Sequence, residues 1–217
     1  MPLPTDSMFF GFRDKLTDEQ RRYVDSIFDN QLTIVNAKSG TGKTTLAVAA
    51  ARLLGKPLVY IFSPVEESKM GFRPGTQQEK EAEYWQPLKD ALLEINENPS
   101  QAIFDETNID AMKAGHVWVY PKSHVFARGT NIKDSTVILE EAQNYTRGEL
   151  KKTLTRIHDS CTVIMIGHDG QCDLPNPSKS GFVPYLEHFR DEPYANVCEL
   201  TVNFRGRLAQ KADELTW

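Results

Sequence analysis

The sequence has no apolar run that approaches the roughly 20 residues of a membrane-spanning helix, and its first residues lack the layout of a signal peptide. We therefore expect a cytoplasmic protein with no membrane partner. Its three cysteines, Cys161, Cys172 and Cys198, cannot all pair and are far apart in the sequence, so we expect reduced thiols. Cys172 lies near His168, but no second cysteine and histidine cluster accompanies them, and no structural metal site is predicted.

Basic residues are fewer than acidic residues in this sequence. There are 25 lysine and arginine residues against 30 aspartate and glutamate residues, which gives a formal net charge of −5. This balance argues against a protein that coats nucleic acid through a generally basic surface, and it leaves room only for a local basic patch. At 217 residues the chain can bury one sizeable core, so we expect one domain over residues 1–217.

What the sequence does contain is a regular alternation of strand-like and helical segments. Runs rich in β-branched or aromatic residues predict strands at Leu32 to Val35, Leu58 to Phe62, His116 to Tyr120, Val137 to Glu140, Val163 to Gly167 and Asn196 to Leu200. Helical periodicity is found at 17–28, 44–54, 78–96 and 147–157. This alternation predicts an α/β fold whose mostly parallel sheet carries helices on both faces and binds ligands at the carboxyl ends of its strands. The segment at about 65–115 is longer than an ordinary connection between two strands, and we expect it to form a helical insertion that covers the site.

A stretch directly after the first predicted strand has the chemistry of a phosphate-binding loop. Residues 36–45 read N-A-K-S-G-T-G-K-T-T, close to the P-loop pattern G-x-x-x-x-G-K-[ST]. Gly40 and Gly42 allow successive N–H groups to face one anion, and Lys43 and the following helix N-terminus favour negative charge. The Thr44 hydroxyl falls where a P-loop places a Mg²⁺ ligand. The alternative is an ordinary glycine-rich turn, but strand, loop and helix occur in the order that the motif requires. The expected nucleotide-binding residues of the loop are Lys38, Ser39, Gly40, Thr41, Gly42, Lys43, Thr44 and Thr45.

A second predicted strand ends in two carboxylates, Glu140 and Glu141. A nucleotide hydrolase needs one carboxylate to hold the metal ion through its water shell and another to orient or deprotonate the attacking water. We assign the metal to Glu140 and the catalytic role to Glu141. An acidic helix cap is the alternative for the pair in isolation, but the P-loop upstream favours the catalytic interpretation.

Three further polar residues stand near predicted strands. Gln171 follows the strand at 163–167, where it can sense the γ-phosphate, and Arg205 follows the last strand, where it can neutralise charge in the transition state. Gln20, in L-T-D-E-Q before the first strand, can donate to and accept from adenine. Each glutamine alone would be read as a surface residue, and the order of the motifs supports the functional roles.

The order of these motifs resembles the PhoH family, the phosphate-starvation-inducible ATPases of bacteria and phages. The resemblance runs from about Leu16 to Arg207 and includes L-T-D-E-Q, A-K-S-G-T-G-K-T, G-F-R-P-G, F-A-R-G-T, L-E-E-A-Q-N, G-H-D-G-Q-C-D-L-P and N-F-R. It implies a three-layer RecA-like P-loop NTPase, similar to the first RecA-like domain of superfamily 1 helicases, with ATP and Mg²⁺ as cofactors. It also implies a link to RNA or single-stranded nucleic acid, and a phage-encoded member would act in the host cytoplasm. Three positions depart from the family pattern: Ala37 replaces glycine, and Glu140 and His168 each replace aspartate, so hydrolysis weaker than in the family is one expectation.

Superfamily 1 helicases close the ATP site between two RecA-like domains, and a chain of 217 residues with one P-loop has no room for the second. We therefore expect a homo-oligomer, a hexameric head-to-tail ring in which a neighbour supplies an arginine in trans, as the family resemblance also implies. The candidates for that arginine are Arg73, Arg128, Arg156 and Arg207. Two basic patches are candidates for nucleic acid, with solvated surface charge as the alternative: Lys122, Arg128 and Lys133, or Lys151, Lys152 and Arg156.

Three function classes stay open on this sequence. The first is an oligomeric ATPase that acts on RNA or single-stranded nucleic acid. The second is a nucleotide-dependent binding or switch module with slow hydrolysis and no helicase activity. The third is a small-molecule kinase, which usually carries an arginine-rich lid and an acceptor pocket that the sequence does not reveal.

Overall fold

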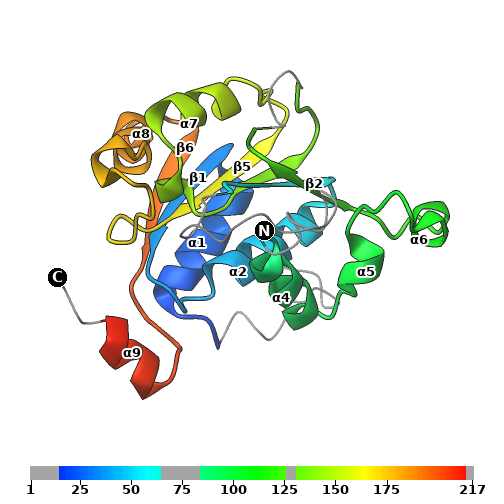
Figure 1. Cartoon of the computed structure of the whole chain (residues 1–217), viewed down its shortest axis with the longest axis horizontal. Helices are drawn as coiled ribbons and strands as arrows, with labels where there is room; N and C mark the ends of the chain where they lie inside the picture. The colour runs from blue at the N-terminus through cyan, green and yellow to red at the C-terminus, as the bar shows by residue number, and fades with distance from the viewer. Residues whose placement is uncertain (1–14, 65–83, 126–130, 214–217) are drawn as a thin grey trace.

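The computed structural model describes residues 15–64, 84–125 and 131–213 (Figure 1). Six strands lie in this part of the chain: β1 (Leu32–Ala37), β2 (Leu58–Phe62), β3 (Val119–Ser123), β4 (Thr136–Leu139), β5 (Thr162–Gly167) and β6 (Ala195–Leu200). The helices are α1 (Asp18–Asp29), α2 (Lys43–Leu54), α4 (Gln86–Glu94), α5 (Pro99–Ala102), α6 (Ile109–Lys113), α7 (Arg147–Leu154), α8 (Phe182–Phe189) and α9 (Arg207–Asp213), with 3-10 turns η2 (Ala142–Asn144) and η3 (Pro177–Lys179). No helix of the described residues is long and apolar enough to cross a membrane.

The six strands form one sheet in the order β3-β2-β4-β5-β1-β6, and every neighbouring pair is parallel. The predicted three-layer α/β P-loop fold is therefore confirmed, with a sheet that is wholly parallel among the described strands. Parallel strands need crossover connections that place helices on the faces of the sheet. All six carboxyl ends consequently lie along one edge.

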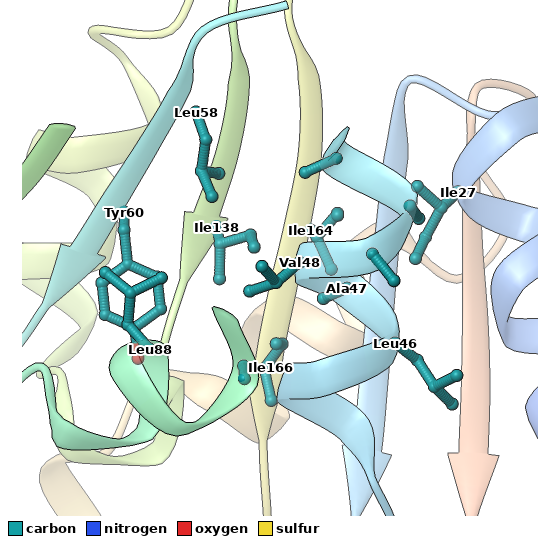
Figure 2. Close-up of a cluster of buried hydrophobic side chains, with 14 of the residues drawn as sticks. Ile27, Leu46, Ala47, Val48, Leu58, Tyr60, Leu88, Ile138, Ile164 and Ile166 are labelled. Atoms are coloured by element: carbon teal, nitrogen blue, oxygen red, sulfur yellow. The ribbon is translucent and has the colours of Figure 1, made fainter. Parts of the chain in front are cut away.

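Two apolar layers hold the helices against the sheet. Helices α1, α2 and α4 pack on one face, and α7 and α8 pack on the other (Figure 1). Neighbouring strand residues such as Ile34 and Val35 point to opposite faces and join different layers, as the period of two in a strand requires. Figure 2 shows Ala47 and Val48 of α2 beside Ile164 of β5, where short side chains let the helix that follows the P-loop lie close to the sheet.

All six predicted strands are present, but one was misplaced. Strand β3 begins at Val119, three residues after the predicted start at His116, because residues 116–118 first complete the preceding segment. The His116 amide donates to the Ala111 carbonyl at the end of α6, and the Trp118 amide donates to Ala102. Only at Val119 does the backbone pair in register with β2.

The predicted helix over 78–96 is represented by α4, and residues 78–83 lie outside the described residues. In the predicted insertion, residues 84–115 hold α4, α5 and α6. Helix α8 was not predicted, because its sequence F-V-P-Y-L-E-H-F is rich in aromatic residues and carries Pro184. Pro184 lies in the first turn of α8, where a missing backbone N–H costs nothing.

Candidate functional site

Four of the segments singled out in the sequence follow neighbouring strands of the sheet. The P-loop follows β1, Glu140 and Glu141 follow β4, residues 168–171 follow β5, and residues 201–205 follow β6. These four strands are adjacent in the order β4-β5-β1-β6. Because all are parallel, the four segments meet at the carboxyl edge, which is where sheets of this class bind ligands.

The P-loop takes the backbone conformation that its glycines permit. Gly40 has φ 75° and Gly42 has φ 78°, both in the left-handed region that residues with a Cβ avoid. Gly42 also caps α2, so the helix begins at Lys43 with its N-terminus toward the loop. Ala37 lies inside β1, is 1% exposed and does not have a positive φ, which explains why an alanine is accommodated there.

The Lys43 ammonium group lies between the loop and the carboxylates. Its Nζ donates to the Ala37 carbonyl at 3.3 Å and lies 3.7 Å from Oε1 of Glu141. The side chain is largely buried, and the Tyr23 hydroxyl of α1 donates to the Lys43 carbonyl at 3.3 Å. Lys43 is therefore a buried positive charge at the mouth of the anion-binding loop.

Gln20 of α1 is bonded to the P-loop backbone. Its Nε2 donates to the Thr41 carbonyl at 3.0 Å, and its Oε1 accepts from the Thr17 amide at 3.1 Å as part of a capping box. A carboxamide can accept twice and donate twice, so the contacts of Gln20 with the described residues use half of its hydrogen-bonding capacity. The adenine role remains a prediction, and the observed contacts show that Gln20 also supports the loop.

Glu140 is a buried carboxylate with one oxygen left unpaired. The Thr44 hydroxyl donates to its Oε1 at 2.9 Å, whereas its Oε2 is buried and has no hydrogen-bond partner among the described residues. Desolvation and the neighbouring Glu141 raise the pKa of Glu140 from its ordinary value of 4.5 to about 7, although Lys43 and Thr44 oppose the shift. Within the same part of the chain, the Tyr60 hydroxyl on β2 also lacks a partner in hydrogen-bond geometry, and it lies close enough to oppose part of that shift.

This arrangement suits a divalent cation. A hydroxyl and a carboxylate with a free buried oxygen are the hard oxygen ligands that Mg²⁺ prefers, and Mg²⁺ takes its remaining ligands from water and phosphate. The described residues contain no group of three histidine, cysteine, aspartate or glutamate side chains that would hold a metal unaided.

Glu141 adopts an unusual backbone conformation. It has φ 50° and ψ 49°, left-handed values that are uncommon for a residue with a Cβ, and it starts η2. One carboxylate oxygen faces Lys43, and the other accepts a hydrogen bond from the Gln143 side chain. Its side chain is 43% exposed, so a water molecule can reach the carboxylate.

The segment after β5 is bonded to η2 and to β1. The His168 amide donates to Oε1 of Gln143 at 3.0 Å, and the Asp169 amide donates to Oδ1 of Asn36 at 3.1 Å. Asn144 and Asp173 exchange two hydrogen bonds of 2.9 and 2.8 Å. Gln171 lies within this fastened segment and is exposed, as its predicted contact with a phosphate requires.

The segment after β6 lies against the P-loop. The Phe204 amide donates to the Gly40 carbonyl at 2.9 Å, and a Cβ placed on Gly40 would meet Cγ of Arg205 at 2.5 Å. Glu19 of α1 accepts two hydrogen bonds of 2.7 Å from Thr201 and so fastens the start of the segment. Arg205 is thereby brought to the loop, while α9 stands out from the rest of the fold (Figure 1).

The other basic candidates that the structure describes lie at both edges of the sheet. Arg156 and Lys133 lie near each other at the amino end of β4, because Ile132 pairs with Ile157 through an isolated bridge. Lys122 lies instead near the carboxyl end of β3, so the sequence-based grouping of Lys122 with Lys133 is wrong. Arg73 and Arg128 fall outside the described residues.

The sequence analysis did not predict four residues whose hydrogen bonds hold the site together: Asn36, Gln143, Asn144 and Asp173. A signal was present for some of them. Asn36 interrupts an apolar strand near its carboxyl end, and Gln143 and Asn144 follow Glu141 by two and three residues.

Comparison with known proteins agrees with this geometry. The family described as "PhoH-like protein" matches residues 14–215. A PhoH-like protein of Mycobacterium tuberculosis is 35% identical over 191 residues, covering 85% of this chain and 52% of the relative. Protein PhoH of Escherichia coli is 32% identical over 186 residues, covering 83% of this chain and 51% of the relative. The chain thus spans about half the length of these curated relatives.

Among solved structures, the helicase domain of Hef from Pyrococcus furiosus superposes with a TM-score of 0.51 at 12% identity. The match covers 88% of this chain and 39% of that chain. Sequence identity this low supports similarity of fold alone.

Proposed function

The chain belongs to the PhoH-like protein family and is a nucleotide-binding protein of that type, and from this premise we propose that it is a Mg²⁺-dependent ATPase. The observation that carries the proposal is the meeting of Lys43, Glu141, Glu140 and Thr44 at one edge of the sheet. A positive charge, a solvent-accessible carboxylate and a buried carboxylate bonded to a hydroxyl are the groups that phosphoryl transfer to water requires.

Each residue has a distinct role in the proposed hydrolysis. The P-loop N–H groups and Lys43 hold the β- and γ-phosphates, and Thr44 and Glu140 would hold Mg²⁺, which would neutralise charge on the phosphates. Glu141 orients the attacking water and accepts its proton, while the bond from the γ-phosphorus to the bridging oxygen breaks and ADP and phosphate leave. Gln171 contacts the γ-phosphate, and Arg205 neutralises charge that develops on the transferring group.

The site is proposed to be completed by a neighbouring copy of the chain, in a ring that the sequence predicts to be hexameric. Arg156 lies at the amino edge of the sheet, away from its own P-loop, and a head-to-tail contact requires such a separation between finger and site. An arginine supplied in trans accelerates related reactions by about 10³- to 10⁵-fold. Arg207 is the other described candidate, and it stands at the start of α9 beside its own site.

RNA or single-stranded nucleic acid is the proposed substrate of the assembled protein. Lys133 and Arg156, with Lys151 and Lys152 on α7, give an exposed basic group of side chains on an otherwise acidic chain. Contacts of lysine and arginine with phosphates supply most sequence-independent binding, and such binding falls steeply with salt.

A second candidate is a nucleotide-dependent switch with slow hydrolysis. The specific observation that favours it is Glu140, whose side chain is one methylene longer than the aspartate of the family pattern and accepts from the Thr44 hydroxyl at 2.9 Å. A longer side chain would displace a bound Mg²⁺ relative to the phosphates, and slow turnover would follow.

The test is steady-state ATP hydrolysis with Mg²⁺, measured on protein of known size in solution, with and without RNA or single-stranded DNA. The proposal expects hydrolysis that a K43A substitution abolishes and that nucleic acid stimulates. Hydrolysis that persists in K43A would contradict the site. Tight ATP binding with negligible hydrolysis under every condition would favour the switch.

A further inference from the structure

The Gln143 carboxamide forms two hydrogen bonds in the proposed ATPase site, one through its nitrogen and one through its oxygen. Its Nε2 donates to the Glu141 carboxylate, and its Oε1 accepts from the His168 amide at 3.0 Å. The residue is 2% exposed, so these bonds do not compete with bulk water. A buried carboxamide that bridges two segments in this way fixes their relative position.

The two segments joined by Gln143 carry different parts of the proposed chemistry. Glu141 stands at the start of η2, and the segment that begins at His168 carries Gln171. The Gln143 carbonyl also accepts from the Cys172 thiol at 3.3 Å, so this residue contacts the segment through its backbone as well as its side chain. Asn144 adds two bonds to Asp173 next to it.

The orientation of Glu141 depends on such support. Its left-handed backbone stores strain, and its side chain is 43% exposed, so burial does little to fix the carboxylate. Lys43 at 3.7 Å attracts one carboxylate oxygen without the directionality of a short hydrogen bond. The Gln143 amide supplies the directional contact to the other oxygen.

We propose that Gln143 is a positioning residue that orients the Glu141 carboxylate and ties it to the segment carrying Gln171. The proposal rests on the proposed ATPase function. It adds that Glu141, which faces the attacking water, and Gln171, which faces the γ-phosphate, move together, because the buried Gln143 side chain bonds to both segments.

The first test is kinetic. A Q143M substitution keeps the length of the side chain but removes donor and acceptor, so kcat for ATP should fall about 10- to 100-fold as the base loses its orientation. The Michaelis constant for ATP should stay within about two-fold, because Gln143 does not hold the nucleotide. A Q143E variant, which cannot donate to Glu141, should be as slow as Q143M.

A matched control and a double-mutant cycle separate positioning from general damage. C172A removes the thiol bond to the Gln143 carbonyl but leaves the carboxamide in place, and it should retain kcat within about two-fold. In an E141D background, where the shorter side chain keeps a carboxylate but draws it away from Gln143, Q143M should cause little further loss of kcat. A loss in C172A equal to that in Q143M, or an undiminished loss in the E141D background, would overturn the proposal.

The second test does not depend on turnover. Hydrogen exchange at the His168 amide should be faster in Q143M than in the wild type, since its acceptor is lost, while E141Q should leave it unchanged. Unchanged exchange at His168 in Q143M would show that the two segments are not tied through Gln143. If the wild type binds ATP but does not hydrolyse it, the proposed function fails, whereas this exchange result still tests the tie.

Discussion

Replacing Gly40 with alanine tests the packing of the segment after β6 against the P-loop. Gly40 has φ 75°, where a Cβ is strained whatever the surrounding space. The new methyl group would also lie 2.5 Å from Cγ of Arg205 and 2.5 Å from Oδ1 of Asn203. Distances this short force one of the two segments to move.

The magnitude follows from separating these two costs with a matched pair of glycines. Gly55, at the end of α2, has φ 68° and no atom within 4 Å of an added Cβ, so G55A reports backbone strain alone. That strain costs about 1–2 kcal/mol, and overpacking typically adds about 1–3 kcal/mol. We therefore expect the free energy of unfolding to fall by about 1–2 kcal/mol in G55A and by about 2–5 kcal/mol in G40A.

The assay is urea unfolding of the nucleotide-free protein, accompanied by ATP binding. A loss of 1 kcal/mol lowers the melting temperature of a chain of this size by about 2–4 °C, so the two variants are separable by melting as well. G40A should weaken ATP binding and G55A should not. Adding R205A should recover part of the stability lost in G40A, because Cγ is then gone.

Equal destabilisation in G40A and G55A would refute the reasoning. It would mean that residues 203–205 do not rest on the P-loop in solution, and the placement of Arg205 beside the phosphates would lose its support. A G40A loss that R205A does not relieve would place the clash elsewhere, with Asn203 as the remaining neighbour.

Three further predictions concern the base, the buried carboxylate and the assembly. Q20A should raise the Michaelis constant for ATP and reduce the preference for ATP over GTP if Gln20 reads adenine; an equal rise for both nucleotides would assign it only to support of the P-loop at Thr41. Folding raises the pKa of Glu140 from 4.5 to about 7, so the free energy of unfolding of the nucleotide-free protein should fall by on the order of 3 kcal/mol as pH rises from about 4.5 to about 7. Urea titrations of E140Q should show no such dependence on pH from this residue. A pH dependence that is unchanged in E140Q would contradict the burial of this charge. Activity per chain should rise with protein concentration, and mixing K43A chains into the wild type should depress it by more than dilution alone; a specific activity that stays constant down to monomeric dilution would show that the site is complete within one chain.

The parts of the fold that follow from local sequence were predicted well. Strands β2, β4 and β5 are short apolar runs, and the alternation of strands with helices favours a parallel sheet, so the carboxyl edge and the motifs along it could be predicted from the sequence. The left-handed conformations of Gly40 and Gly42 were likewise predicted from the P-loop pattern and are confirmed.

The features that the sequence did not predict depend on contacts between segments far apart in the chain. Gln143 meets His168 only because β4 and β5 are neighbours in the sheet, and Arg205 meets Gly40 because β1 and β6 are. The raised pKa of Glu140 needs the burial around it, which no local pattern reports. Helix α8 was missed because its packing against β5 and α7 overrides the strand preference of its aromatic residues.

The most direct test of the account is the fate of ATP bound to E141Q. The glutamine keeps the shape of the side chain but cannot accept the proton of the attacking water. Protein mixed with labelled ATP and Mg²⁺ is separated from free nucleotide, and the bound label is identified. The account predicts bound ATP in E141Q where the wild type yields ADP and phosphate. Conversion to ADP at the wild-type rate in E141Q, with conversion blocked instead in E140Q, would contradict the roles assigned to the two carboxylates.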